Sequence, residues 1–284
     1  MRVLLLSELS VPVPWGEIRG KVWGPDYGRP VLCLHGWADN CGAFNTLIPL
    51  LPKECRYVAV DLAGHGLSSH RPPGDFYSLS EYVMDVRRVA DGVCFSALYP
   101  EMVDALVLLD GFGVLPTNSK EISKIVRQGM DAILQFEKKP EEKKRVYTYG
   151  KAVESVLFLS GCWLQTRSLS EQSVHILLER GLVQVEGGTS LSLLLSERNN
   201  LTLLSHLLAA ECFNRIFSEP AQGEFASTLL QGLKNRHHTV VTVPGGHHVH
   251  LNKPEVVAPF VSDLLRTKVL SQSNNGQHKK HCCV

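Results

Sequence analysis

Hydrophobic runs recur along the chain, and three of them lead directly into a glycine-containing turn. Residues 30–34 run into His-Gly-Trp, residues 57–61 into Leu-Ala-Gly-His-Gly-Leu, and residues 239–243 into Pro-Gly-Gly-His. Apolar runs of about five residues without alternation are typical of strands buried on both faces of a parallel sheet. The carboxyl ends of such strands meet at one edge, where open α/β sheets build their sites. The pattern therefore predicts an α/β fold whose site is formed by these turns.

The beginning of the chain is expected to add an antiparallel hairpin to this sheet. Residues 9–23 hold two extended stretches joined at Pro14-Trp15-Gly16, and proline with glycine between such stretches marks a turn. Residues 1–6 are apolar, but the run is short for a signal peptide and Glu8 follows at once, so we expect a strand of the mature protein. No apolar run approaches the length needed to cross a bilayer.

Helical spacing of apolar residues predicts helices around the sheet. Asp39 or Asn40 can cap the first, Ser80 caps the second, and residues 254–269 form the last. The positions expected to face the sheet are Phe44, Leu47, Ile48 and Leu51, then Tyr82, Val83, Val86 and Val89, and finally Val256, Val257, Phe260, Val261, Leu264 and Leu265.

Too few residues separate the second helix from the next apolar run for another strand and its crossover. Helical spacing continues from residue 88 to Pro100, and an apolar run at residues 103–109 follows immediately. A parallel strand with its crossover needs about a dozen residues or more, which are not available here. We therefore predict one fused helix over residues 80–99, and we expect residues 103–109 to lie beside residues 30–34.

Four parts of the chain are distinguished by composition. Residues 1–110 and 213–270 are expected to form the core, and residues 111–212, which carry charge clusters and helical spacing without an obvious strand, form a mostly helical lid. Residues 271–284 are expected to be a disordered tail.

Composition narrows the classes of partner. The 284 residues are 44% hydrophobic with a net charge of +1, and no basic stripe suited to nucleic acid is present. The eight cysteines include no C-x-x-C pair or zinc-like spacing, so buried, reduced thiols in the cytoplasm are expected.

Five segments carry a resemblance to a known family: VPWG, VLCLHGWADN, DLAGHGLSSH, YPEMVDALVLLD and HVHLNKPE. The chain resembles the α/β-hydrolase family, and within it the serine hydrolase-like group of vertebrates. The resemblance implies a mostly parallel sheet flanked by helices, with a helical lid and no cofactor. It also implies hydrolysis of an ester or related acyl bond by a Ser-His-acid triad. Against this pattern the chain lacks the family's fifth strand and, we expect, its seventh, before the helix at residues 224–234.

The resemblance assigns the base to His247, which two preceding glycines leave free to be aimed. Strand-like alternation places His248 on the opposite side, and His250 matches a second, structural histidine of the family. Metal binding by these three residues is the weaker alternative, because no Cys or carboxylate lies at ligand spacing and no metal is expected. His65 is expected to support its loop.

The oxyanion hole is expected at Gly36 and the backbone N–H of Trp37; a tight turn with Trp37 as a packing residue is the alternative. The acid that orients the base is expected to be Asp110, at a position used by some relatives. Capping of the lid is an equally good role for Asp110, and Glu219 is a weaker candidate for the acid.

The nucleophile cannot be assigned. A nucleophile elbow requires the sequence G-x-S-x-G, which occurs nowhere in the chain. Ser68 lies in a different loop, and Cys94 and Ser96 lie within the predicted fused helix. The sequence thus predicts a triad without its serine. The segment that should carry this serine is missing at a join around Asp91 and Gly92, which resembles an omitted exon of the kind that alternative splicing produces.

Three functions remain open. The chain is a serine hydrolase of an acyl substrate, a non-catalytic binding or regulatory protein that keeps the hydrolase pocket, or an unstable form. Its expected partner is a small acyl substrate or ligand. Cys282 and Cys283 follow two lysines and could carry lipids, although the unmodified tail is expected; the resemblance also implies an association with vesicles or peroxisomes.

Overall fold

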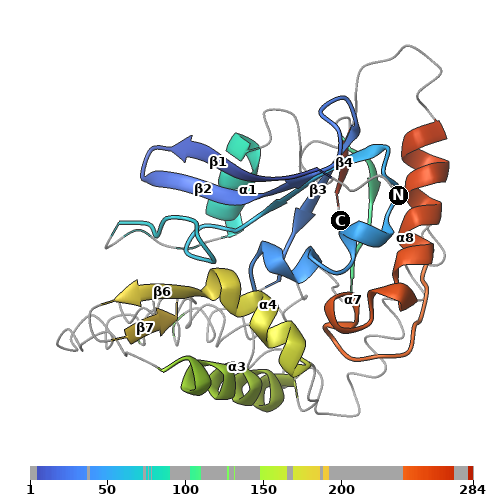
Figure 1. Cartoon of the computed structure of the whole chain (residues 1–284). Helices are drawn as coiled ribbons and strands as arrows, with labels where there is room; N and C mark the ends of the chain where they lie inside the picture. The colour runs from blue at the N-terminus through green and yellow to red at the C-terminus, as the bar shows by residue number, and fades with distance from the viewer. Residues whose placement is uncertain are drawn as a thin grey trace.

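The computed structural model describes residues 5–36, 39–72, 75, 77, 79–89, 103–109, 127, 131, 148–164, 169–185, 188–191, 239–271 and 281–283. These residues form a six-stranded, mostly parallel sheet with helical segments around it, and a separate two-stranded hairpin (Figure 1). The predicted α/β class is confirmed.

The amino-terminal hairpin is present where the sequence predicts it. Strand β1 (Leu6–Val13) pairs antiparallel with β2 (Gly16–Trp23) across the turn at residues 14–15. Strand β2 in turn pairs antiparallel with β4 (Cys55–Val60). The hairpin therefore forms one border of the described sheet.

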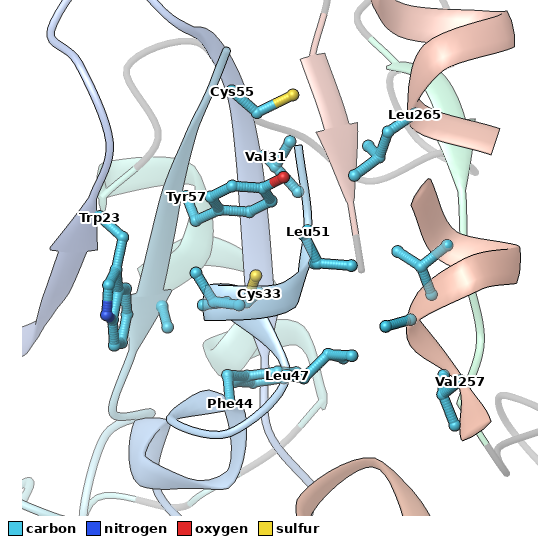
Figure 2. Close-up of a cluster of buried hydrophobic side chains, with 14 of the residues drawn as sticks. Trp23, Val31, Cys33, Phe44, Leu47, Leu51, Cys55, Tyr57, Val257 and Leu265 are labelled. Atoms are coloured by element: carbon cyan, nitrogen blue, oxygen red, sulfur yellow. The ribbon is translucent and has the colours of Figure 1, made fainter. Parts of the chain in front are cut away.

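Strand β3 (Arg29–Leu34) and strand β4 lie parallel in the middle of the sheet, as their unbroken apolar runs predict. Val31, Cys33 and Tyr57 are at most 1% exposed. Figure 2 shows these three side chains facing Leu47 and other apolar residues in the main core cluster. The Tyr57 hydroxyl donates to the Pro52 carbonyl at 2.7 Å, so this phenol is buried without losing its hydrogen bond.

The first predicted helix is replaced by two short 3₁₀ turns, η1 (Cys41–Phe44) and η2 (Ile48–Leu50). Pro49 lies in the second turn and cannot continue an α-helix, because it lacks the N–H and clashes with the preceding turn. The predicted apolar residues Phe44, Leu47, Ile48 and Leu51 are nevertheless all buried.

The second predicted helix is α1 (Leu79–Val89), which begins one residue before Ser80, so the cap predicted at Ser80 lies inside the helix. Arg71 ties the preceding loop to this helix through ion pairs with Glu81, at 2.9 Å, and with Asp85. The rest of the predicted fused helix, residues 90–99, lies outside the described residues.

The middle of the sheet differs from the prediction. The strand order is β1-β2-β4-β3-β8-β5, where β5 is Val103–Leu106 and β8 is His281–Cys283. Strand β8 lies parallel to both neighbours, with Cys283 opposite Leu32 on one side and Leu106 on the other. The place beside β3 that was predicted for residues 103–109 is thus taken by β8.

Within the segment expected to be a disordered tail, residues 281–283 instead form part of the sheet as β8, while residues 272–280 and 284 lie outside the described residues. The physical reason lies in the neighbours. Strands β3 and β5 each present a row of backbone N–H and C=O groups toward the gap between them, and such groups need partners when buried.

The strand predicted at residues 239–243 is wrong. These residues carry no strand pairing in the described sheet, and Val241 is 45% exposed. A run of β-branched residues becomes a strand only where a neighbouring edge receives it. The region of the predicted seventh strand, residues 212–217, lies outside the described residues.

The last predicted helix is divided into η5 (Pro254–Val256), α8 (Ala258–Leu264) and a π-helical segment, η6 (Leu265–Leu270). Val257, Val261 and Leu265 are buried against the sheet, as expected. Phe260 is 48% exposed and does not face the sheet, which corrects its prediction. The preceding helix, α7 (Val249–Asn252), is a single turn.

The predicted lid region contains α3 (Tyr149–Leu164) and α4 (Glu171–Gly181), in agreement with its helical spacing. It also contains an unpredicted antiparallel hairpin, β6 (Leu182–Val185) with β7 (Gly188–Leu191). Figure 1 shows these four elements together on one side of the main sheet. Among the described residues, no helix is both long and apolar enough to span a membrane.

Candidate functional site

The three turns predicted to form the site are linked by hydrogen bonds at the carboxyl ends of β3 and β4. His35 follows β3 directly, and its ring bonds to the turn after β4. Asp39, further along the turn after β3, contacts His248 before α7. The convergence of these turns at one edge of the sheet is what the sequence pattern predicts.

His35 joins two of the turns as a neutral side chain. Its Nδ1 lies 2.7 Å from the Gly36 carbonyl oxygen, and its Nε2 accepts the Leu62 backbone N–H at 2.9 Å. Burial lowers the pKa of His35 below its ordinary value. The neutral ring with its proton on Nδ1 satisfies both contacts, so His35 fastens the turns together.

Asp39 and His248 form the second link. Oδ2 of Asp39 lies 3.3 Å from Nε2 of His248, and both side chains are less than 10% exposed. Burial alone would raise the pKa of Asp39, but the hydrogen bond from His248 and the nearby histidines hold this pKa below its ordinary value. The alternation expected of a strand placed His248 away from the site. Residues 239–248 do not form a strand, and His248 instead pairs with the site carboxylate Asp39.

The predicted base, His247, lies beside this pair. Its ring centroid is 4.9 Å from that of His248, with the rings nearly perpendicular. The predicted acid Asp110 and the predicted oxyanion residue Trp37 lie outside the described residues, as does Glu219. Gly36 is described and exposed. The roles of these residues in a triad and an oxyanion hole thus remain predictions.

Two further histidines have the surroundings of structural residues. His65 is buried, with Nδ1 3.1 Å from the Ala63 carbonyl oxygen and its ring 5.0 Å from that of His35. His250 is 9% exposed and its ring lies 6.1 Å from that of Phe44. In the described parts of the chain, no group of three or more His, Cys, Asp or Glu residues is placed to hold a metal ion.

Asp61, at the end of β4, is the polar centre of this edge. Its carboxylate is fully buried and accepts the backbone N–H of Cys41 at 2.8 Å and that of Leu67 at 3.0 Å. Nε of Arg180 donates to Oδ2 at 2.9 Å. Burial would raise the pKa of Asp61, but Arg180 and the two backbone donors keep it below its ordinary value. Asp61 therefore remains a charged anchor for both turns.

The short distance between Gly66 and Asp61 explains why the last position of the Ala-Gly-His-Gly motif is a glycine. Its φ angle is +52°, and a Cβ built on it would lie 2.4 Å from the carboxyl carbon of Asp61. Only glycine combines this left-handed backbone with so close an approach. Ser68, in the same turn, donates to the Asp61 carbonyl at 2.6 Å and accepts the Arg19 N–H at 2.8 Å. The Ser68 hydroxyl thus bonds to backbone groups, which agrees with the expectation that Ser68 is not the nucleophile.

Arg180 was not identified from the sequence. It reaches Asp61 from helix α4 and also bonds Glu8 of β1, with Nη1 2.9 and 3.1 Å from the two Glu8 oxygens. Arg180 lies 119 residues from Asp61 and 172 from Glu8, so no local pattern connects them. Asp39 was noted only as a helix cap, and its partner His248 lies 209 residues away in sequence.

The sequence model described as "Alpha/beta hydrolase family" matches residues 31–260, a span that includes every described residue of this edge except Glu8 and Arg19. The chain belongs to the alpha/beta hydrolase family. The chain is similar to the "Serine hydrolase-like protein" of Danio rerio, with 41% identity over 95% of this chain and 91% of the relative. It is similar to the "Serine hydrolase-like protein 2" of Homo sapiens, with 32% identity over 92% and 95%. The resemblance stated from its motifs is confirmed.

A solved structure agrees with this family assignment. A crystal structure of a hypothetical protein from Pseudomonas aeruginosa PAO1 superimposes with a TM-score of 0.70. The two chains share 28% identity, and the match covers 90% of this chain and 99% of the bacterial one. The two proteins therefore share one fold.

Proposed function

We propose that this chain is a serine hydrolase-like protein that binds a small ester or related acyl compound without hydrolysing it through a serine. The observation that carries the proposal is the absence of G-x-S-x-G from all 284 residues. Acyl transfer in a serine hydrolase begins with attack by a serine that an adjacent base activates. Without the elbow, the acyl group has no serine to receive it.

Two further observations support the proposal. On the side of β3 away from β4, the neighbouring strand in the described sheet is β8, and its residues His281, Cys282 and Cys283 include no serine. The match with the Danio rerio relative extends over 305 positions, which exceeds the 284 residues of this chain. The relative therefore has residues at positions where this chain has none, which agrees with an omitted segment.

The remaining edge carries groups suited to recognising an acyl compound. His247 and the adjacent His248 can exchange hydrogen bonds with a carbonyl or leaving-group oxygen. The predicted donors at Gly36 and Trp37 would bind the carbonyl oxygen itself. These groups can fix the orientation of an ester whether or not a nucleophile follows.

A fluorophosphonate probe tests the catalytic part of the proposal. The purified chain is incubated with the probe beside an active serine esterase, and peptides are mapped by mass spectrometry. We expect no adduct on this chain while the esterase is fully labelled. A stoichiometric adduct on one serine would overturn the proposal and identify a recruited nucleophile.

Binding is tested separately with ketone analogues of acyl esters, which resist hydrolysis. We expect saturable binding by calorimetry, weakened in His247→Ala and unchanged in His175→Ala, a half-exposed histidine on α4. A cooperative melting curve for each variant establishes that it is folded. Absence of saturable binding by a cooperatively folded chain would contradict the binding function, and absence of a cooperative melt would identify the unstable form.

The lipid attachment considered for Cys282 and Cys283 would have to compete with the sheet. Both residues are paired through their backbones to β3 and β5. An acylated segment held at a membrane surface could not keep these pairings. We therefore propose the unmodified segment as the state that completes the fold.

A further inference from the structure

Helix α4 contacts the site at three points along its length, and the first is Asn252, the last residue of α7. Oδ1 of Asn252 accepts the Ser170 backbone N–H at 3.1 Å and the Ser173 hydroxyl at 2.7 Å. Ser170 is also the N-cap of α4, with its hydroxyl oxygen accepting the Ser173 N–H at 3.1 Å. The start of α4 and the end of α7 thus share one hydrogen-bond cluster.

The second point is Asn40, which follows the site carboxylate Asp39 in the chain. Nδ2 of Asn40 donates to the Leu177 carbonyl oxygen at 2.8 Å, while its Oδ1 accepts the Gly42 N–H at 2.9 Å. Asn40 is 2% exposed, so both ends of its amide are satisfied away from solvent. The third point is the contact of Arg180 with Asp61.

Apolar packing joins the same elements. Leu251 of α7 is 2% exposed and lies in one buried cluster with Val174 and Leu177 of α4 and Ala43 of η1. Helix α7 has only four residues and cannot be stable by its own hydrogen bonds. Its position must come from these contacts and from Thr46, whose hydroxyl donates to the Leu251 carbonyl at 2.9 Å.

We propose that Asn252 and Asn40 are positioning residues and that α4 is a fixed wall of the site. Asn252 holds the segment that carries His248, and Asn40 holds the turn that carries Asp39. Helix α4 therefore sets the separation at which Asp39 and His248 meet. The proposal deepens the proposed function, on which it rests for the role of this site.

The proposal also changes the meaning of the predicted lid. Residues 171–181 lie inside the region expected to cover the site, yet they are bonded to all three segments that form it. Moving α4 as part of a lid would break the buried Arg180–Asp61 ion pair, the buried contact of Asn40 and the partly buried contact of Asn252 together. Access for a ligand must then come from movement elsewhere in the chain.

The test follows the titration of individual carboxylates by NMR in ¹³C-aspartate-labelled protein without ligand. Within the described part of the chain, the titratable groups that act on Asp39 are His35, His248 and His250. In Asn252→Ala we expect the Asp39 midpoint to rise toward its ordinary value as the contact with His248 loosens, while the Asp61 midpoint stays unchanged. A general loss of stability would not move one carboxylate selectively.

Two matched variants complete the experiment. Gln172→Ala removes an exposed amide from the same turn of α4 and is expected to leave both midpoints unchanged. Asn252→Asp keeps the acceptor oxygen and is expected to behave like the wild type. If Asn252→Ala does not fold, Ser173→Ala removes only one of the two donors and replaces it in the titration.

An Asp39 midpoint that stays unchanged in a folded Asn252→Ala or Ser173→Ala variant would overturn the proposal. So would an equal shift in Gln172→Ala. Because the titration contains no ligand, its failure is distinguishable from failure of the proposed binding function. If both hold, ligand affinity should fall several-fold in Asn252→Ala and remain at the wild-type value in Gln172→Ala.

Discussion

Arg180 and Asp61 meet at 2.8 Å between Nη2 and Oδ2, across 119 residues of sequence. Both side chains are at most 4% exposed. Asp61 also receives the backbone N–H groups of two site turns. One carboxylate thus connects helix α4, the turn after β3 and the turn after β4, so a change at Arg180 acts on the site as well as on stability.

Arg180→Met is expected to destabilise the folded state by about 3–5 kcal/mol, because it leaves the buried charge of Asp61 without its partner. Glu8→Gln is the matched change at the outer end of the same network. Glu8 is about half exposed, so its loss should cost at most about 1 kcal/mol. Urea unfolding of both variants measures these differences. Equal effects of the two substitutions would contradict the assignment of Asp61 as the anchored partner.

Stability is expected to fall in acid because of Asp61 and Asp39. Both have pKa values below the ordinary value in the folded state, so the unfolded chain binds protons first as the pH decreases. Their contribution is complete above the unfolded pKa of about 4 and is lost as the pH falls through the folded values.

Free energies of unfolding between pH 6 and pH 3 check this expectation. Asp61→Asn should be less stable than the wild type at pH 6, and it should lose less stability on acidification. Parallel curves for the two proteins would show that Asp61 does not contribute to the acid dependence.

Gly66→Ala and Gly150→Ala are expected to have opposite effects. At Gly66 the added Cβ would meet the Asp61 carboxylate in a left-handed backbone conformation, which should cost about 1–3 kcal/mol or more. At Gly150, in α3, no described atom beyond the adjacent residues and the helix's own backbone lies within 4 Å of the added Cβ, and alanine favours the helix by up to about 1 kcal/mol. Thermal melting distinguishes them; a Gly66→Ala variant as stable as the wild type would contradict the close approach.

The position of β8 is testable by cross-linking. Ala105 lies opposite Cys282 in the pairing of β5 with β8, at a spacing of about 5 Å that permits a disulfide. Oxidation of Ala105→Cys should therefore join it to Cys282, as mapped by mass spectrometry. Asp104→Cys, at the register shift between Val103 and Ala105 and without a Cα partner in β8, serves as the control. Equal yields from both variants would count against the strand order.

The sequence predicted elements whose signal is local. Strands β3 and β4 carry unbroken apolar runs that any parallel sheet must bury, and the hairpin of β1 and β2 carries its own turn. Strand β8 has no such signal, because His-Cys-Cys is three residues long and acquires strand geometry only from its two neighbours. Residues 239–243 have the opposite property, with a strong local preference for a strand and no pairing in the described sheet.

The same distinction applies to the site. The turns at His35 and Asp61 could be predicted because each follows a recognisable strand. The sequence could not show whether His247 or His248 pairs with Asp39. That choice depends on the position of α7, a single helical turn that follows His248 directly and is fixed by contacts with other elements. Arg180 lies 119 residues from Asp61, and no local pattern connects the two. Asn252 belongs to the HVHLNKPE motif, but its partner Ser173 lies 79 residues away on α4.

Strands β3 and β8 pair with each other although they lie at opposite ends of the sequence, which has a consequence for synthesis on the ribosome. One edge of β3 acquires its partner β4 within about thirty residues, whereas the other waits for residues 281–283, nearly the whole chain later. Until then, an apolar strand with an unpaired edge is exposed to other nascent chains. We expect this protein to depend on chaperones during translation and to complete its folding slowly after release.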